Sequence, residues 1–329
     1  MHAAADLLPA WLAFLLAALC AGVMGYAIQR GGTCTVAAVD ELVSKRRWQR
    51  LAAMAEASLW VAGGLLLART LHLLPEMPAA YAVSGFTLLG GAMLGFGAWV
   101  NGACVFGAVA RLGSGEWAYL ATPPGFYAGC LSVGPLFMPA AARRLAEVSP
   151  VLQAPLGAAL MFVAFALWRI GGALRGGLRP GELGRRVWSP HAATAVIGVT
   201  FLFSLLLAGA WAYTDVLAEL ARGMAHSLPA RGALLLALLL GALWGGWTAG
   251  RLRATPPSAA KLLRCFVGGL VMGWGSLLIP GANDGLILIG MPLLRPYAWL
   301  AFTAMCLAIA AALLLSRRLA MPVAGRSAG

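Results

Sequence analysis

The sequence predicts an all-α polytopic membrane protein with about nine transmembrane helices, short re-entrant segments and an inverted repeat. The first observation behind this is composition. Of the 329 residues, 61% are hydrophobic and 11% are charged, whereas soluble proteins carry roughly 25% charged residues. The mean hydropathy is +0.84. Because so few polar side chains cannot cover a soluble globule of this length, we expect the chain to lie in a lipid bilayer.

The second observation is the spacing of the apolar stretches, which have about the 20 residues that a helix needs to cross a bilayer. The first stretch starts near Pro9 and follows His2 and Asp6 rather than basic residues. We therefore interpret it as a spanning helix and not as a cleaved signal peptide. The nine predicted spans lie near residues 9–29, 51–71, 80–97, 117–137, 152–170, 191–212, 231–250, 262–279 and 297–315.

Three apolar or glycine-rich pieces between these spans are too short to cross a membrane alone. They cover residues 31–43, 98–111 and 280–294, and we expect them to be broken or re-entrant segments. The predicted organisation is a first half at 1–150, a connector helix with a basic loop at 151–190, a second half at 191–316 and a basic tail at 317–329.

The third observation is an internal repeat. GGAMLGFGAWVNGAC at Gly90 to Cys104 resembles GGLVMGWGSLLIPGAN at Gly268 to Asn283. With nine spans the two copies run in opposite directions, so spans one to four match spans six to nine as an inverted repeat. Glycine-broken apolar segments at matching positions of two such halves indicate a substrate path near the middle of the membrane.

The distribution of basic residues predicts the orientation. Lys and Arg gather in 44–50, 171–190, 251–264 and the tail, and cytoplasmic loops carry such an excess. An outer N-terminus and a cytoplasmic C-terminus in a bacterial inner membrane place all four inside. The loop 138–150 is the exception, because it falls outside although basic residues outnumber acidic ones in it. The net charge of +13 is then topogenic, and we expect no nucleic-acid partner.

Two cysteines share a glycine frame. In GYAIQRGGTC and GFGAWVNGAC, Gly32 and Gly102 each precede a cysteine by two residues, at Cys34 and Cys104. At the start of a short helix a thiol lies beside free backbone N–H groups, a position that favours anions or soft sulfur groups. The neighbouring Arg30 could draw an anion into the protein, as could Arg111 beside the second segment.

The remaining cysteines, Cys20, Cys130, Cys265 and Cys306, lie in ordinary spans, where packing is their expected role. The sequence has neither a CxxC motif nor cysteine and histidine at metal-binding spacing, so we predict no metal, disulfide framework or cofactor.

Three runs resemble the signature regions of the YeeE/YedE membrane family, and the resemblance extends over almost the whole chain. They are QRGGTCTVAAVDEL from Gln29, GFGAWVNGACVFGAVARLGSGE from Gly95 and GGLVMGWGSLLIPGANDGLILIGMPLL from Gly268. The resemblance implies an importer of sulfur compounds, thiosulfate being the best-known substrate, with an hourglass interior and cysteines that touch the substrate in turn. Cys34 and Cys104 match two of these cysteines.

The family's third cysteine is absent. The chain has Gly281, Ala282, Asn283 and Asp284 there, with Asn283 in the register of Cys104. The Asn283 amide could bind an oxyanion, whereas an ionised Asp284 would repel one. Another inorganic sulfur anion or a persulfide is therefore an alternative to thiosulfate. Asn-Asp-Gly is equally a common turn and helix-capping sequence.

The mechanism that these residues suggest is a relay. A small sulfur anion would meet Asn283 from the outer side, pass to Cys104 near the midplane, and leave by Cys34 and Arg30. The chain would then not be an enzyme, and a cytoplasmic sulfur-carrier protein could be its partner. The predicted pathway residues are Arg30, Gly32, Cys34, Gly102, Cys104, Gly281, Asn283 and Asp284.

Two alternatives stay open. One is a membrane sensor or partner protein that binds sulfur species and signals through the basic loops. The other is a membrane-embedded sulfurtransferase with a persulfide on a cysteine, although no histidine lies near either cysteine in the sequence. No ATP-binding motif of the form GxxxxGK[ST] is present, so the energy source cannot be assigned to this chain.

Overall fold

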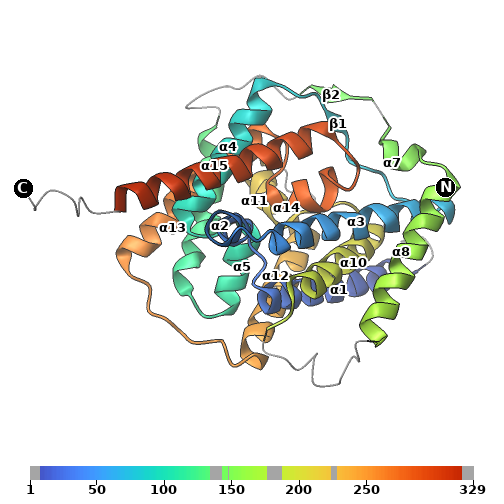
Figure 1. Cartoon of the computed structure of the whole chain (residues 1–329), viewed down its shortest axis with the longest axis horizontal. Helices are drawn as coiled ribbons and strands as arrows, with labels where there is room; N and C mark the ends of the chain where they lie inside the picture. Colours follow the sequence, from blue (N-terminus) through green and yellow to red (C-terminus); the bar gives the residue numbers. More distant parts are fainter. Residues whose placement is uncertain (1–7, 134–142, 147, 176–186, 224–227, 321–329) are drawn as a thin grey trace, which may run out of the picture.

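The computed structural model describes residues 8–133, 143–146, 148–175, 187–223 and 228–320. Figure 1 shows long helices on both sides of a centre where short helices lie. The first half contains α1 (Ala10–Gly31), α2 (Thr35–Lys45), α3 (Gln49–Thr70), β1 (Ala80–Tyr81), α4 (Gly85–Asn101), α5 (Val105–Gly113), the 3₁₀ turn η2 (Trp117–Ala121), α6 (Thr122–Ser132) and β2 (Arg144–Leu145), which pairs antiparallel with β1. The connector contains α7 (Pro150–Gln153) and α8 (Leu156–Arg175). The second half contains α10 (Pro190–Ala208), α11 (Tyr213–Ala221), α12 (Leu228–Thr248), α13 (Ala259–Leu278), α14 (Asn283–Gly285), the π-helical η3 (Leu286–Gly290) and α15 (Pro296–Ala320).

The described helices confirm an all-α polytopic membrane protein. Among the residues that the structure describes, seven helical stretches are long and apolar enough to cross a membrane: Ala10–Lys45, Gln49–Thr70, Gly85–Gly113, Pro190–Ala208, Leu228–Thr248, Ala259–Leu278 and Pro296–Leu319. They correspond to seven of the nine predicted spans.

The two other predicted spans have a different form. The span expected at 117–137 is the turn η2 followed by the 11-residue α6. Pro123 and Pro124 lie in the first turn of α6, and because proline has no N–H, a single helix cannot run through them. The span expected at 152–170 is α8, which has a shorter apolar stretch at Leu156–Gly172.

The repeated glycines form the contact between α4 and α13. A Cβ on Gly97 would lie 2.8 Å from the carbonyl oxygen of Gly268, and one on Gly90 would lie 2.8 Å from that of Gly275. Only glycine permits such a close backbone approach. The glycine near the start of α4 meets the glycine near the end of α13, and the reverse holds at the other contact. The two helices therefore run antiparallel.

On their other sides, α4 and α13 also make matching glycine contacts with a further helix each. Gly91 packs on the Ala301 carbonyl of α15, and its repeat partner Gly269 packs on the Thr122 carbonyl of α6, at 2.4 and 2.3 Å from an added Cβ. The short α6 thus contacts α13 as the long α15 contacts α4. Likewise, α1 packs against α12 and α10 against α3.

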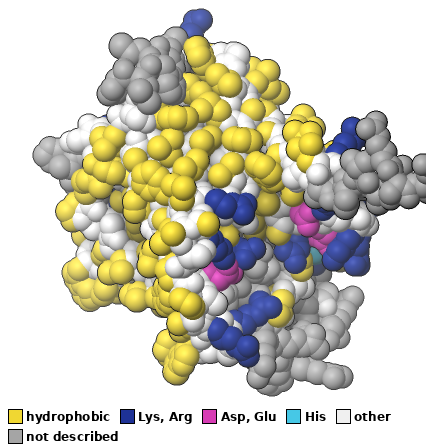
Figure 2. All heavy atoms as spheres, turned by 90° about the vertical axis from the view of Figure 1, so that its left-hand side faces the viewer, with side chains coloured by type: hydrophobic (Ala, Val, Ile, Leu, Met, Phe, Trp, Pro, Cys, Tyr) yellow, Lys and Arg dark blue, Asp and Glu magenta, His cyan; other side chains and the backbone are white. Residues whose placement is uncertain are grey.

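The described parts of all four basic segments lie at one end of the helix bundle; residues 176–186 and 321–329 of these segments lie outside the described residues. Arg317 pairs with Asp40 close to segment 44–50. The Trp188 N–H, at the end of segment 171–190, donates to the Arg30 carbonyl, and Thr248, just before segment 251–264, accepts from the Arg30 guanidinium. Figure 2 shows basic and acidic side chains grouped beside a broad apolar surface. The grouping is the one that the predicted orientation requires.

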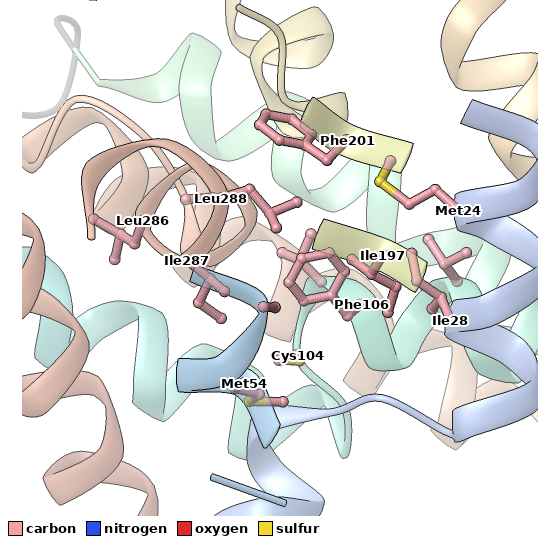
Figure 3. Packing of buried hydrophobic residues seen from close by; sticks show 14 of the residues in the cluster. Met24, Ile28, Met54, Cys104, Phe106, Ile197, Phe201, Leu286, Ile287 and Leu288 are labelled. Carbon is pink, nitrogen blue, oxygen red and sulfur yellow. The ribbon is translucent and has the colours of Figure 1, made fainter. Parts of the chain in front are cut away.

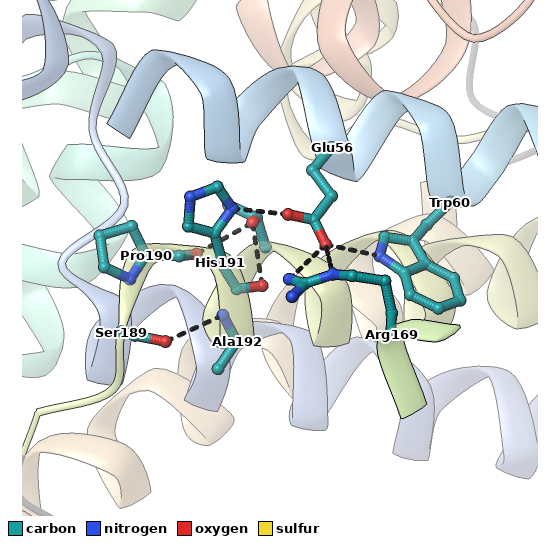
Figure 4. A network of polar contacts seen from close by, with 8 residues as sticks. Glu56, Trp60, Arg169, Ser189, Pro190, His191 and Ala192 are labelled. Carbon is teal, nitrogen blue, oxygen red and sulfur yellow. Dashed lines mark hydrogen bonds and ion pairs between the residues drawn. The ribbon is translucent and has the colours of Figure 1, made fainter. Parts of the chain in front are cut away.

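The connector helix α8 is attached to the bundle through Glu56 of α3. Arg169 of α8 pairs with Glu56, with Nη2 2.6 Å from Oε1, and His191 of α10 lies 2.5 Å from Oε2. The Trp60 indole also donates to Oε1. Figure 4 shows these side chains converging on the Glu56 carboxylate, which therefore links three helices.

Candidate functional site

The two cysteines with the glycine frame lie next to each other inside the protein. Cys34 precedes the first turn of α2 and Cys104 precedes that of α5, each as an extended N-cap residue. The N–H of Thr35 donates to Cys104 Sγ at 3.1 Å, and the two thiols are close enough to interact. Cys104 is fully buried and Cys34 is 9% exposed. The structure therefore brings together two sulfurs that are 70 residues apart in sequence.

Gly107 makes room for this pair. A Cβ at this position in α5 would lie 2.5 Å from Cys34 Sγ, so any other residue would displace the thiol. A third sulfur belongs to Met54, whose Sδ lies 3.8 Å from the hydroxyl of Thr35. Figure 3 shows Met54 and Cys104 together, with Phe106 and Ile287 on the side away from Met54.

The first turns of α2 and α5 lie against these sulfurs. Cys34 Sγ faces the N–H of Ala37 and Cys104 Sγ faces that of Gly107, although neither contact has full capping geometry. Backbone N–H groups at a helix start are orphan donors, so the surroundings of both sulfurs favour electron-rich groups.

A small hollow reaches Cys34 from the basic end of the bundle. It has a volume of about 10 Å³, room for roughly one water molecule. Its lining residues are Gly31, Gly32, Thr33, Cys34, Arg50, Met54, Pro190 and Thr194. We call it the inner hollow. Arg50 gives it a positive charge, partly balanced by Glu41 at 3.5 Å.

A larger cavity of about 280 Å³ enters from the opposite end. Thr194 near the start of α10 lines the inner hollow and Ala210 beyond its end lines this cavity, so the part of α10 from Thr194 to Ala208 separates the two by about 21 Å. We call it the outer cavity. Its charged lining residues are Asp215, Glu219, Arg222 and Arg231, and its other lining includes Gly281, Ala282 and Gly285.

Between the two openings lie buried polar side chains. Both polar atoms of the Asn283 side chain lack a hydrogen-bond partner among the described residues, and so does the Tyr213 hydroxyl. A buried amide without partners costs about 1–3 kcal/mol. The helices that carry them, α14 and α11, contact each other, and α14 contacts α5. Tyr213 is close enough to Cys34, Cys104 and Asp284 for electrostatic interaction.

Asp284 has a structural role. Its Oδ1 accepts from the Thr214 hydroxyl at 2.7 Å, and its Oδ2 accepts from the Thr214 N–H at 3.2 Å. Since Thr214 lies in the first turn of α11, this carboxyl stabilises the start of that helix. It is 1% exposed and does not line either opening.

Four breaks, not three, meet at this centre. The unexpected one follows α10, where Gly209 has a φ of +82° and α11 begins after Ala212. Residues 213–221 lie between the spans predicted at 191–212 and 231–250, but instead of a loop they form this helix, and Thr214 and Val216 in its first turn are buried. The breaks at Gly32, Gly102 and Gly281 have positive φ angles, as their glycines predict.

The structure also shifts the register of the third break by one residue. The N-cap of α14 is Ala282, not Asn283, so Ala282 takes the position that Cys104 has at α5. Pro280 explains the shift, because proline cannot donate within a helix and α13 ends before it at Leu278. By the same comparison Ala212 takes the position of Cys34.

Arg30 lies away from the thiols. Its guanidinium donates to the Tyr26 hydroxyl at 2.7 Å and to Thr248 at 2.8 Å, so it ties α1 to α12. The cation beside Cys34 is Arg50, which the sequence did not single out. Tyr213 and Thr214 were also missed, because they follow an apolar run that has no glycine and cysteine frame.

No group of three or more potential metal ligands occurs in the part of the chain that the structure describes. In comparisons with known proteins, a family model described as sulphur transport matches residues 30–311. No curated protein matches the chain. The matched residues include all four breaks and the lining residues of both openings.

Proposed function

The chain belongs to the sulphur transport family, in agreement with the resemblance in its sequence, and on this premise we propose that it imports an inorganic sulfur compound, thiosulfate or a related anion, into the cytoplasm. The observation that carries the proposal is the buried pair Cys34 and Cys104 between two openings at opposite ends of the bundle. Two openings that meet at a narrow centre form an hourglass, a shape that suits transport of a small solute by alternating access or through a narrow pore.

The glycine contacts support an inverted repeat. Gly97 meets Gly268 as Gly90 meets Gly275, so each contact becomes the other when the two halves are exchanged. Equivalent helices that touch antiparallel are related by an axis perpendicular to them. If these helices cross the bilayer, that axis lies in the membrane plane, and the halves face opposite sides as in other transporters.

The proposed path has three stages. Arg222 attracts an anion into the outer cavity, where Arg231 is already paired with Glu219, because a basic residue raises the local anion concentration. The anion passes Asn283 to Cys104 and then to Cys34. It leaves through the inner hollow beside Arg50. We place the basic end in the cytoplasm of a bacterial cell, where a sulfur-carrier protein could accept the product.

Thiols suit the narrow part of this path. A thiol is a weak hydrogen-bond donor, so each sulfur can hold an anion without retaining it, as conduction requires. Growth of cells that depend on this protein for their sulfur source tests the role of the pair. Cys104→Ala should abolish growth at unchanged membrane abundance, whereas Cys265→Ala, which removes a buried thiol that lines neither opening, should grow like wild type.

Normal growth of the Cys104→Ala cells would refute the proposed path. The same cells can separate a transporter from a sensor. A sensor would bind sulfur species at the thiols and change signalling, but radiolabelled sulfur would not accumulate in the cells. Accumulation that disappears with Cys104→Ala is the outcome that transport requires.

A further inference from the structure

We propose that the narrow region selects a protonated sulfur species with at most one negative charge, such as hydrogensulfite or hydrosulfide, over the thiosulfate dianion. This inference rests on the proposed function and names the class of substrate. It follows from the hydrogen-bonding and charge of four side chains whose polar groups are buried: Asn283, Tyr213, Asp284 and Cys104.

The first argument is the unpaired amide. Asn283 is 0% exposed, and both its Nδ2 and its Oδ1 lack partners among the described residues. The NH₂ group needs an acceptor and the carbonyl oxygen needs a donor. Thiosulfate can supply acceptors but carries no proton, so it would leave Oδ1 unpaired. A protonated anion supplies both.

The second argument is the Tyr213 hydroxyl, which is also buried without a partner in the described part of the chain. Its ring is fixed against Phe106, with centroids 6.5 Å apart. A hydroxyl can donate and accept hydrogen bonds. Like the Asn283 amide, it therefore favours a solute with both a donor and an acceptor, and it lies close to Cys34 and Cys104.

The third argument is charge. Asp284 adjoins Asn283 and accepts two hydrogen bonds from Thr214, and no Lys or Arg of the described residues pairs with it. The cations that line the two openings are Arg222, Arg231 and Arg50, of which Arg231 is paired with Glu219 and Arg50 with Glu41. The buried Arg30 and Arg295 line neither opening. Arg111, which is within electrostatic range of Cys34, is paired with Glu116. In a low-dielectric interior a second negative charge on the solute is therefore disfavoured.

The test uses the purified full-length protein in liposomes, with radiolabelled sulfite and radiolabelled thiosulfate as separate solutes. Mildly acidic buffer keeps sulfite largely as hydrogensulfite, while thiosulfate stays a dianion. We expect initial uptake of sulfite label to exceed that of thiosulfate by about tenfold or more. Protein-free liposomes correct for passive entry.

Two variants test the side chains. Asp284→Asn should reduce the preference for sulfite over thiosulfate, because removal of the carboxylate raises thiosulfate uptake. Its amide can still accept from the Thr214 N–H, and the Thr214 hydroxyl can turn to accept from the new NH₂ group, so α11 keeps its contact. Tyr213→Phe keeps the ring and should reduce sulfite uptake several-fold. The control is Tyr127→Phe, because Tyr127 lines neither opening; its sulfite uptake should equal that of the wild type.

Three outcomes are distinguishable. The expected preference, narrowed by Asp284→Asn, supports the inference. Thiosulfate uptake equal to or greater than sulfite uptake by the wild-type protein overturns the inference and leaves the proposed function intact. Uptake of neither label above the protein-free control refutes the proposed function, and the inference falls with it. The ratio of sulfite uptake to thiosulfate uptake by the wild-type protein distinguishes the first two outcomes without any variant.

Discussion

Thr35 donates its backbone N–H to the sulfur of Cys104 at 3.1 Å, which joins the start of α2 to the start of α5 through a thiol. A comparable contact joins the other two short helices, where Thr214 donates to Asp284. In each half, a side chain at the start of one short helix thus accepts from the first turn of another. These contacts join the starts of the four short helices in pairs at the centre of the molecule.

Gly107→Ala should impair transport. The new Cβ would lie 2.5 Å from Cys34 Sγ and displace that thiol from Cys104, at a cost in stability of about 1–3 kcal/mol. Uptake of radiolabelled sulfur compound by cells, normalised to membrane abundance, measures the effect. Gly232→Ala in α12 meets nothing within 4 Å and should behave as wild type. Equal uptake by the two variants would show that the position of Cys34 does not matter.

The two thiols should form a disulfide on mild oxidation. Diamide accepts the two hydrogens lost by Cys34 and Cys104, and a covalent bond between α2 and α5 would close the narrow region. We expect peptide mass spectrometry to find the crosslink, and a reducing agent to restore uptake. Cys34→Ser should prevent both effects. If maleimide labels both cysteines fully after oxidation, the thiols are not neighbours.

Gly275→Val should prevent folding. An added side chain here meets the backbone of α4, with the Gly90 carbonyl oxygen 2.6 Å from the Cβ position and Leu94 N at 2.8 Å, and backbone cannot move aside as a flexible side chain can. Size-exclusion chromatography of detergent extracts should show loss of the monodisperse protein. Gly157→Val in α8, where an added Cβ meets nothing within 4 Å, is the control, and a monodisperse Gly275 variant would contradict the α4 contact.

Glu56→Ala should loosen α8. The change leaves Arg169 and His191 without their shared carboxylate (Figure 4). The pairs are partly exposed, so we expect a loss of about 1–3 kcal/mol, between the values for exposed and buried pairs. Thermal unfolding in detergent measures it, with exposed Glu76→Ala as the control. An unchanged melting temperature would mean that packing alone holds α8 against the bundle.

The long apolar helices and three of the breaks could be predicted from the sequence, because hydropathy and glycine position determine them directly. The repeat aligns Gly90 with Gly268, whereas the contact of Gly90 with Gly275 was found only in the structure. The break before Tyr213 was missed, since Ala210, Trp211 and Ala212 continue the apolar run without a glycine and cysteine frame.

The placement of charged side chains was less predictable. Arg30 is four residues from Cys34 in sequence, but it lies on α1 while Cys34 begins α2 after the turn at Gly32. Its guanidinium consequently faces α12. Arg50 reaches the hollow because α3 packs back against α2, a tertiary contact that local sequence does not encode. Proximity along the chain is therefore a poor guide to the lining of a path built from broken helices.

Uptake of a radiolabelled inorganic sulfur anion by liposomes that contain the purified protein tests the central claim most directly. The account predicts uptake by the wild type and by Cys265→Ala, and none above the protein-free level by Cys34→Ala or Cys104→Ala. Uptake that persists at the wild-type rate when both Cys34 and Cys104 are replaced would contradict a path through the thiol pair.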